Sequence, residues 1–220
     1  MRERFLAIAE SAAARFRAIL AETFEQGEGG DSKKTWPRVK LGDIGRIAMC
    51  KRILKSQTQS EGDIPFFKIG TFGKTPDAYI SQDIFDEYSS KFSYPRKGDI
   101  LISAAGTIGR TMVFDGKPSY FQDSNIVWLE HDRSAAINEY LMYFYLSEPW
   151  VVSNGATILR LYNGDIESLR IPLPPIPVQR SIVARLDAAR ADCGRIEELA
   201  RKGAEGCVAL RAALLKEAFE

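Results

Sequence analysis

The sequence of 220 residues predicts an α+β fold, in which a mixed, mostly β domain is flanked by long helices that pair as an antiparallel coiled coil. Near both ends of the chain, apolar residues recur at alternating four- and three-residue steps, as in a coiled-coil seam. Between these ends, short apolar runs are separated by Gly, Pro, Asp and Asn, which is typical of strands joined by turns. The predicted boundaries are a helix over 1–26, a linker over 27–35, the mixed domain over 36–177 and a helix over 178–220.

The N-terminal helix carries its predicted seam on Phe5, Ala9, Ala12, Phe16, Ile19 and Thr23. Residues 27–32 are rich in Gly and polar side chains, which indicates a flexible linker and a domain boundary. Residues 18–25 also resemble residues 213–220, so the chain finishes on a variant of the sequence near its start, as one unit of a repeat would. The alternative is that helices rich in Leu, Ala and Glu look alike by composition.

The mixed domain is predicted to contain five strands and three short helices. We expect the strands over residues 39–48, 65–69, 100–104, 111–114 and 126–129. We expect helices over 81–92 and 164–169, and a third that begins with Asn138 as its N-cap and ends before Pro149. The aromatic residues of this third helix, Tyr140, Tyr143, Phe144 and Tyr145, are expected in the core rather than on a base-stacking surface.

The C-terminal helix is preceded by a Pro-rich segment over 171–177, which should be extended, so the helix is expected to begin only after Pro177. Its narrow seam needs a partner helix, either the N-terminal helix of the same chain or a helix of a second copy. Phe16 and Ile19 on the first helix, with Leu186, Ile196, Leu210 and Leu214 on the last, are the predicted interface residues.

Composition and charge exclude several classes of protein. The net charge is +1, yet residues 33–55 hold eight Lys or Arg side chains against one Asp, a local basic patch that can attract phosphates. For Lys33 and Lys34, a solvated linker is the simpler reading. The three cysteines have no CxxC spacing and predict reduced thiols in a cytoplasmic protein. With only one histidine, a Cys/His zinc site or a histidine-based catalytic triad is not expected. No apolar run is long enough to span a bilayer, which predicts no membrane partner.

Three segments resemble type I restriction-modification specificity subunits. Residues 97–110, with GDILIS followed by GTIGR, resemble a characteristic stretch of that family. Residues 163–183 resemble the end of its target recognition domain and the start of the helix that follows, and residues 36–44 resemble its beginning. Val178 departs from the family, which usually has an acidic residue before the glutamine. A full subunit of this family has two recognition domains, whereas this chain resembles half of one, with a single domain over most of residues 36–190.

The resemblance implies DNA recognition without catalysis. Its implied partners are double-stranded DNA, adenine-methylating modification subunits and a restriction subunit, with no cofactor, and pairing of two half-length chains as a homodimer would rebuild a reader of a bipartite target. The sequence agrees, because Pro172-Leu173-Pro174-Pro175 lacks the Asn or Asp of an amino-methyltransferase motif, and no phosphate loop is present. One alternative is a coiled-coil protein-interaction module without DNA specificity, and another is an enzyme with an unrecognised active site.

The candidate DNA-binding residues are of two kinds. Phosphate or groove contacts are expected from Lys51, Arg52 and Lys55, followed by Lys68, Thr71 and Lys74. Base contacts are expected from Arg110 to guanine and from Gln122 and Asn125 to adenine, with Thr107, Arg160 and Tyr162 nearby in loops. For Gly106 and Gly109, a tight turn that fixes the fold is favoured over a direct role at DNA.

Overall fold

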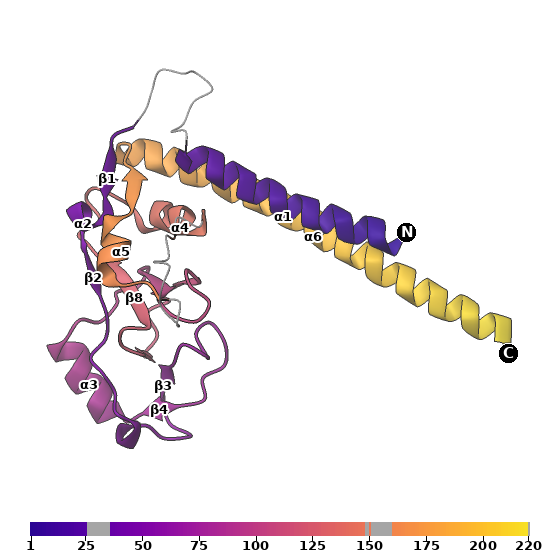
Figure 1. The fold of residues 1–220 in the computed structure, drawn as a ribbon. Helices are drawn as coiled ribbons and strands as arrows, with labels where there is room; N and C mark the ends of the chain where they lie inside the picture. Colours follow the sequence, from indigo (N-terminus) through magenta and orange to yellow (C-terminus); the bar gives the residue numbers. More distant parts are fainter. Residues whose placement is uncertain (26–35, 148–149, 151–159, 220) are drawn as a thin grey trace. The chain divides into compact units, whose positions relative to one another are not determined.

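The structure is a computed structural model that describes residues 1–25, 36–147, 150 and 160–219 (Figure 1). It divides into two compact units, one comprising Met1–Thr35 with Arg180–Glu220 and the other comprising Trp36–Gln179. The predicted linker over 27–35 lies outside the described residues. We call the two parts the helical unit and the mixed unit.

The helical unit is an antiparallel pair of helices. Helix α1 (Arg2–Glu25) runs alongside α6 (Ile176–Phe219), and α6 continues beyond the first residue of α1 (Figure 1). Phe5 lies against Gly203, whereas Ile19 lies beside Cys193, so successive turns of α1 meet α6 in reverse order. The predicted antiparallel pairing is therefore confirmed, and it forms within one chain.

Helix α6 begins earlier than predicted. It starts at Ile176 and includes Pro177 in its first turn, so the expectation of a start after Pro177 is wrong. The backbone N–H groups of Val178 and Gln179 donate to the Pro175 carbonyl, which opens the helix. Proline fits this first turn because the turn has no intrahelical partner for the missing N–H.

In the residues of the mixed unit that the structure describes, nine short strands form three sheets. The first sheet pairs β1 (Arg38–Lys40) with β9 (Arg170–Pro172). The second has the order β2 (Arg46–Ala48), β8 (Ile126–Glu130), β5 (Ile100–Ser103) and β6 (Thr111–Val113). The third has the order β4 (Tyr79–Ile80), β3 (Ile64–Phe67) and β7 (Tyr120–Phe121). All pairs are antiparallel except β3 with β7, which are parallel.

The predicted strand over 39–48 is wrong, because it is two strands separated by a helical turn, α2 (Leu41–Ile44). Asp43 in this turn accepts a hydrogen bond from the Lys40 backbone N–H at 3.1 Å. The Leu41 N–H donates to the Leu169 carbonyl, and the Leu41 side chain is buried. A local side-chain bond and a tertiary contact thus override the strand propensity of this run.

The other short helices are η1 (Lys55–Gln57), α3 (Gln82–Lys91), α4 (Asn138–Leu146) and α5 (Asn163–Ser168). Ser81 caps α3 by accepting a hydrogen bond from the Ile84 N–H. The prediction that Asn138 is the N-cap of α4 is wrong, because Asn138 is the first helical residue and Ile137 is the N-cap. Its side chain is needed elsewhere, because the amide nitrogen donates to the Gly98 carbonyl at 2.6 Å.

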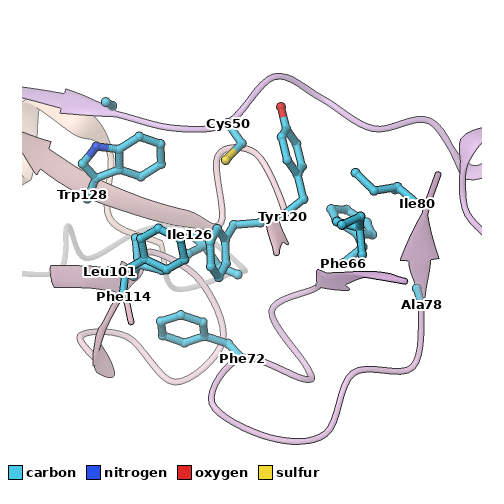
Figure 2. Packing of buried hydrophobic residues seen from close by; sticks show 13 residues of the cluster. Cys50, Phe66, Phe72, Ala78, Ile80, Leu101, Phe114, Tyr120, Ile126 and Trp128 are labelled. Atoms are coloured by element: carbon cyan, nitrogen blue, oxygen red, sulfur yellow. The ribbon is translucent and has the colours of Figure 1, made fainter. Parts of the chain in front are cut away.

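One apolar core joins the second and third sheets. Figure 2 shows Trp128, Leu101 and Ile126 at one end of this core, Phe66 and Ile80 at the other, and Tyr120 between them. Burial raises the pKa of the Cys50 thiol in this core to about 12, which keeps it protonated at neutral pH. The aromatic residues of α4 are buried, as predicted: Tyr140, Tyr143, Phe144 and Tyr145.

Two buried polar networks hold the loops around this core. Asp99 pairs with Arg133 at 2.8 Å, while the Asn138 side chain bonds His131 at 2.8 Å. Burial lowers the pKa of His131, so the imidazole is neutral at pH 7. In the second network, the fully buried Gln179 accepts from the Ile137 N–H and donates to the carbonyls of Ala135 and Pro174.

Candidate nucleic-acid interface

An open cleft of about 520 Å³ lies where several strands of the mixed unit end. The parallel strands β3 and β7 end at the same sheet edge, which places Lys68 beside Gln122. The antiparallel pairing of β2 with β8 brings the segment after β2, with Arg52, to the start of β8, with Asp123. The cleft is lined by Arg52, Ile53, Lys55, Thr58, Phe66, Lys68, Ala78, Gln122, Asp123, Ser124, Asn125 and Arg160.

Four cationic side chains of the cleft come from three segments of the chain, since Arg52 and Lys55 share the segment after β2. Arg52 donates from both Nε and Nη2 to Asp123 Oδ2, at 2.9 and 2.8 Å. The contact with Asp123 raises the pKa of Arg52 above its ordinary value. Lys68 pairs with Asp77 at 2.9 Å. Arg160 donates to the Ser124 carbonyl at 2.7 Å. Lys55 is exposed and has no ion-pair partner within the described residues. The cleft therefore presents both guanidinium and ammonium groups to an anionic ligand.

The turn that connects β7 to β8 forms one wall of the cleft and is tightly fixed. Gln122 donates its N–H to the Phe67 carbonyl, and the Asn125 carbonyl accepts from the Ala104 N–H. Ser124 has a φ of 60°, a left-handed conformation that is uncommon for a residue other than glycine. Backbone bonds from two neighbouring segments hold the turn, and they fix the points at which the side chains of Asp123 and Asn125 leave the backbone.

Two amide side chains of this turn line the cleft, and they differ in their hydrogen bonds. The Gln122 amide oxygen accepts from the Ile69 N–H at 2.9 Å, so it fixes the loop after β3. The Asn125 side chain makes no hydrogen bond within the described part of the chain, and it is half-buried. Asn125 thus keeps both its donor and its acceptor available, which is the pattern needed to bond an adenine edge.

The remaining candidate residues do not line the cleft. Lys51 lies over the Phe92 ring, 5.1 Å from its centre, and the Thr71 hydroxyl closes a local turn with the Lys68 backbone. Arg110 donates from Nη1 to the Phe72 carbonyl at 2.9 Å. Lys74 and Thr107 are exposed in loops, and Tyr162, 58% exposed, precedes α5.

The GTIGR segment forms a tight turn, as its glycines suggest. Gly106 and Gly109 have φ values of 66° and 77°, which L side chains rarely adopt. The Ser103 hydroxyl bridges the turn, because it donates to the Thr107 carbonyl and accepts from the Arg110 N–H. This geometry agrees with the fold-fixing role favoured for both glycines.

The predicted interface residues of the helical unit fall into two groups. Leu186 is buried, and Phe16 and Ile19 are half-buried. Ile196, Leu210 and Leu214 are exposed in the single chain, to 39%, 62% and 57%. The exposed group leaves apolar surface on α6 that α1 does not cover.

Asp123 and Ser124 are site residues that sequence reasoning missed. An acidic residue repels phosphates, so it is not selected when DNA-binding residues are sought by charge. The only sequence signal is the polar turn formed by residues 123–125 between two apolar runs. Within the described residues, no cluster of three His, Cys, Asp or Glu side chains could hold a metal ion, and no helix is long and apolar enough to span a membrane.

The family of this chain follows from comparison with known proteins. Residues 33–203 match the family of the type I restriction modification DNA specificity domain, and the chain belongs to this family. The resemblance seen in the sequence is thereby confirmed, and the family's role is specificity rather than catalysis.

Relatives and solved structures agree with this assignment. The chain is 59% identical over 149 residues, 68% of its length, to a proposed type I restriction enzyme specificity subunit of Haemophilus influenzae, of which it covers 39%. It superposes over 99% of its length on 53% of the HsdS subunit from Thermoanaerobacter tengcongensis, with a TM-score of 0.70 and 26% identity. A chain of a type I R-M complex gives a TM-score of 0.79 and 25% identity over all of this chain and 54% of that one. The chain thus spans about half the length of these solved relatives.

Proposed function

We propose that this chain is a DNA-recognition subunit of a type I restriction-modification complex, and that its cleft reads one half of a bipartite target. The observation that carries the proposal is the convergence of six sequence-predicted residues on one surface. They are Arg52, Lys55, Lys68, Gln122, Asn125 and Arg160. They come from four segments of the chain: the pairing of β3 with β7 and of β2 with β8 brings three of these segments together, and Arg160 is held there by its hydrogen bond to the Ser124 carbonyl.

The two kinds of side chain in the cleft suit the two tasks of a DNA reader. Lys55 and Lys68 carry ammonium groups, point charges that suit phosphate contacts, which supply affinity without sequence information. Asn125 is fixed on a rigid turn with free amide groups, which suits contact with a base edge. Affinity and specificity would therefore come from neighbouring but separate residues.

The helical unit suits assembly with partner subunits and a second copy. Val208, Leu210, Leu214 and Leu215 are exposed and follow Gly203, which lies against Phe5 near the start of α1. Burial of these side chains in a homodimer, with modification and restriction subunits bound to the assembly, would bring two reading domains onto one DNA.

The length of α6 would then set the number of unspecified base pairs between the half-targets. Insertion of one heptad into α6 is expected to lengthen this spacer, and an unchanged spacer would contradict the ruler role.

Methylation mapping tests the function as a whole. DNA from cells that express this chain with its modification subunit is compared with DNA from cells that express the modification subunit alone. We expect adenine methylation that depends on this chain, at a split palindromic motif. An asymmetric split motif would contradict the homodimer. No new methylation, with a modification subunit shown to be competent with another specificity chain, would contradict DNA specificity and favour an interaction module.

A further inference from the structure

The strongest specific feature of the cleft is the ion pair between Arg52 and Asp123. The two residues lie on different strand connections, yet two guanidinium nitrogens, Nε and Nη2, bond one carboxylate oxygen. The Asp123 side chain is 16% exposed and lies on the rigid turn, whereas the Arg52 side chain is 68% exposed. The geometry is therefore that of a fixed carboxylate holding a solvent-facing guanidinium in one orientation.

The orientation of Arg52 decides which donors remain free. A guanidinium has five N–H groups, and Asp123 occupies the edge formed by Nε and Nη2. The end formed by Nη1 and the second Nη2 hydrogen makes no hydrogen bond within the described residues. This free end carries two parallel N–H donors, the arrangement that bonds O6 and N7 of guanine in the major groove.

We infer that Arg52 reads a guanine in the half-target and that Asp123 is a positioning residue for it. The inference rests on the proposed function and assigns a base to a residue first expected to grip phosphate. An unrestrained arginine would lose side-chain entropy on binding a base, and it could bond a phosphate equally well. Asp123 removes part of this cost in advance, and its negative charge disfavours a phosphate in the same place.

A second ion pair, of which only Lys68 lines the cleft, serves as a comparison. Lys68 and Asp77 also form an ion pair, at 2.9 Å, but a lysine ammonium is a point charge without a planar fork. Both members of that pair are well exposed, with side-chain exposures of 41% and 58%. Removal of Asp77 should therefore strengthen binding to all sequences alike, whereas removal of Asp123 should change which sequences are preferred.

The test measures affinity for duplexes that carry the mapped target and every single base-pair substitution of one half-target. The chain is assembled with its modification subunits, and the variants are Arg52→Lys, Asp123→Ala and Asp77→Ala. We expect Arg52→Lys to reduce discrimination at one G·C pair by roughly 5- to 150-fold, the range of one bidentate base contact, with little change in salt dependence. Asp123→Ala should reduce discrimination at the same pair while affinity for unrelated DNA stays equal or rises. Asp77→Ala should leave every base preference unchanged.

Failure of this inference is distinguishable from failure of the proposed function. If the wild-type assembly binds all duplexes alike, the proposed function is contradicted. If the wild-type assembly is selective and Arg52→Lys keeps every base preference, only the assignment of Arg52 is overturned. If Asp123→Ala raises affinity for all sequences with discrimination intact, Asp123 acts by repulsion alone and its positioning role is overturned. Tryptophan fluorescence confirms that each variant is folded, because all three tryptophans lie in the mixed unit.

Discussion

Replacement of Gln179 by Leu should destabilise the mixed unit, although the substitution keeps the volume of the side chain. Gln179 is fully buried and bonds three backbone groups, the N–H of Ile137 and the carbonyls of Ala135 and Pro174. An unsatisfied buried backbone group costs about 1–3 kcal/mol. Two of the three bonds are only partly buried, so water can reach their partners, and about 1 kcal/mol for each of the three bonds is the least that the substitution should cost. The expected loss of unfolding free energy is about 3 kcal/mol.

The assay is urea unfolding followed by tryptophan fluorescence, because Trp36, Trp128 and Trp150 all report on the mixed unit. With an m-value of about 2 kcal/mol/M, a loss of about 3 kcal/mol lowers the midpoint by about 1.5 M. The control is Gln82→Ala on α3, where the side chain is exposed and the expected change is within about 0.5 kcal/mol. Equal midpoints for Gln179→Leu and the wild type would refute the idea that Gln179 fastens the start of α6 to the loop before α4.

Three further predictions concern the helical unit and the pH dependence of the mixed unit. Gly203→Val should reduce the free energy of unfolding of the helical unit by about 1–3 kcal/mol more than Gly206→Val does, and so give the lower thermal midpoint by circular dichroism. The reason is that a Cβ at Gly203 would lie 2.6 Å from the Phe5 ring, whereas one at Gly206 meets nothing within 4 Å. Equal midpoints for the two variants would argue against this packing. Because the pKa of His131 is lowered in the folded state, its stabilising contribution is present above about pH 6.5 and is lost as pH falls through the folded-state pKa. The urea midpoint should therefore fall between pH 7.5 and 5.5 in the wild type, and it should fall less in His131→Asn. Parallel pH profiles of the two proteins would exclude His131 as the cause. The double variant Ile196→Glu, Leu210→Glu should be a folded monomer in light scattering, because both side chains are exposed in the single chain. An unchanged dimer mass would show that the face of α6 with Ile196 and Leu210 is not the dimer interface.

The sequence predicts the helices and the longer strands because their signals are local. Heptad spacing fixes the two long helices, and the Ser81 cap marks the start of α3. The two-residue strands β4 and β7 are not predicted, because their pairing partner β3 decides them and residues that short carry no periodicity. The helical turn α2 is missed for a similar reason, since its bond to Leu169 comes from a distant segment.

The candidate site is predicted in part, by residue type rather than by geometry. Basic and amide side chains in loops were sufficient to select six residues of the cleft. Chemistry alone could not show that the Arg110 guanidinium bonds the Phe72 carbonyl, or that Thr71 closes a local turn. The pairing of Arg52 with Asp123 joins residues far apart in the sequence, so only the strand register of β2 with β8 reveals it.

The most direct measurement of the central claim, that this cleft holds the DNA, is the salt dependence of DNA affinity for the chain assembled with its modification subunits. The test variant replaces both Lys55 and Lys68 by Ala, and the control replaces Lys91 and Lys117, which do not line the cleft. We expect the test variant to bind all sequences more weakly. The slope of log affinity against log salt concentration should decrease in magnitude by about one unit for each phosphate that a lysine no longer neutralises, while the control matches the wild type. Equal affinity and slope for the test variant and the wild type would show that this cleft does not hold the DNA.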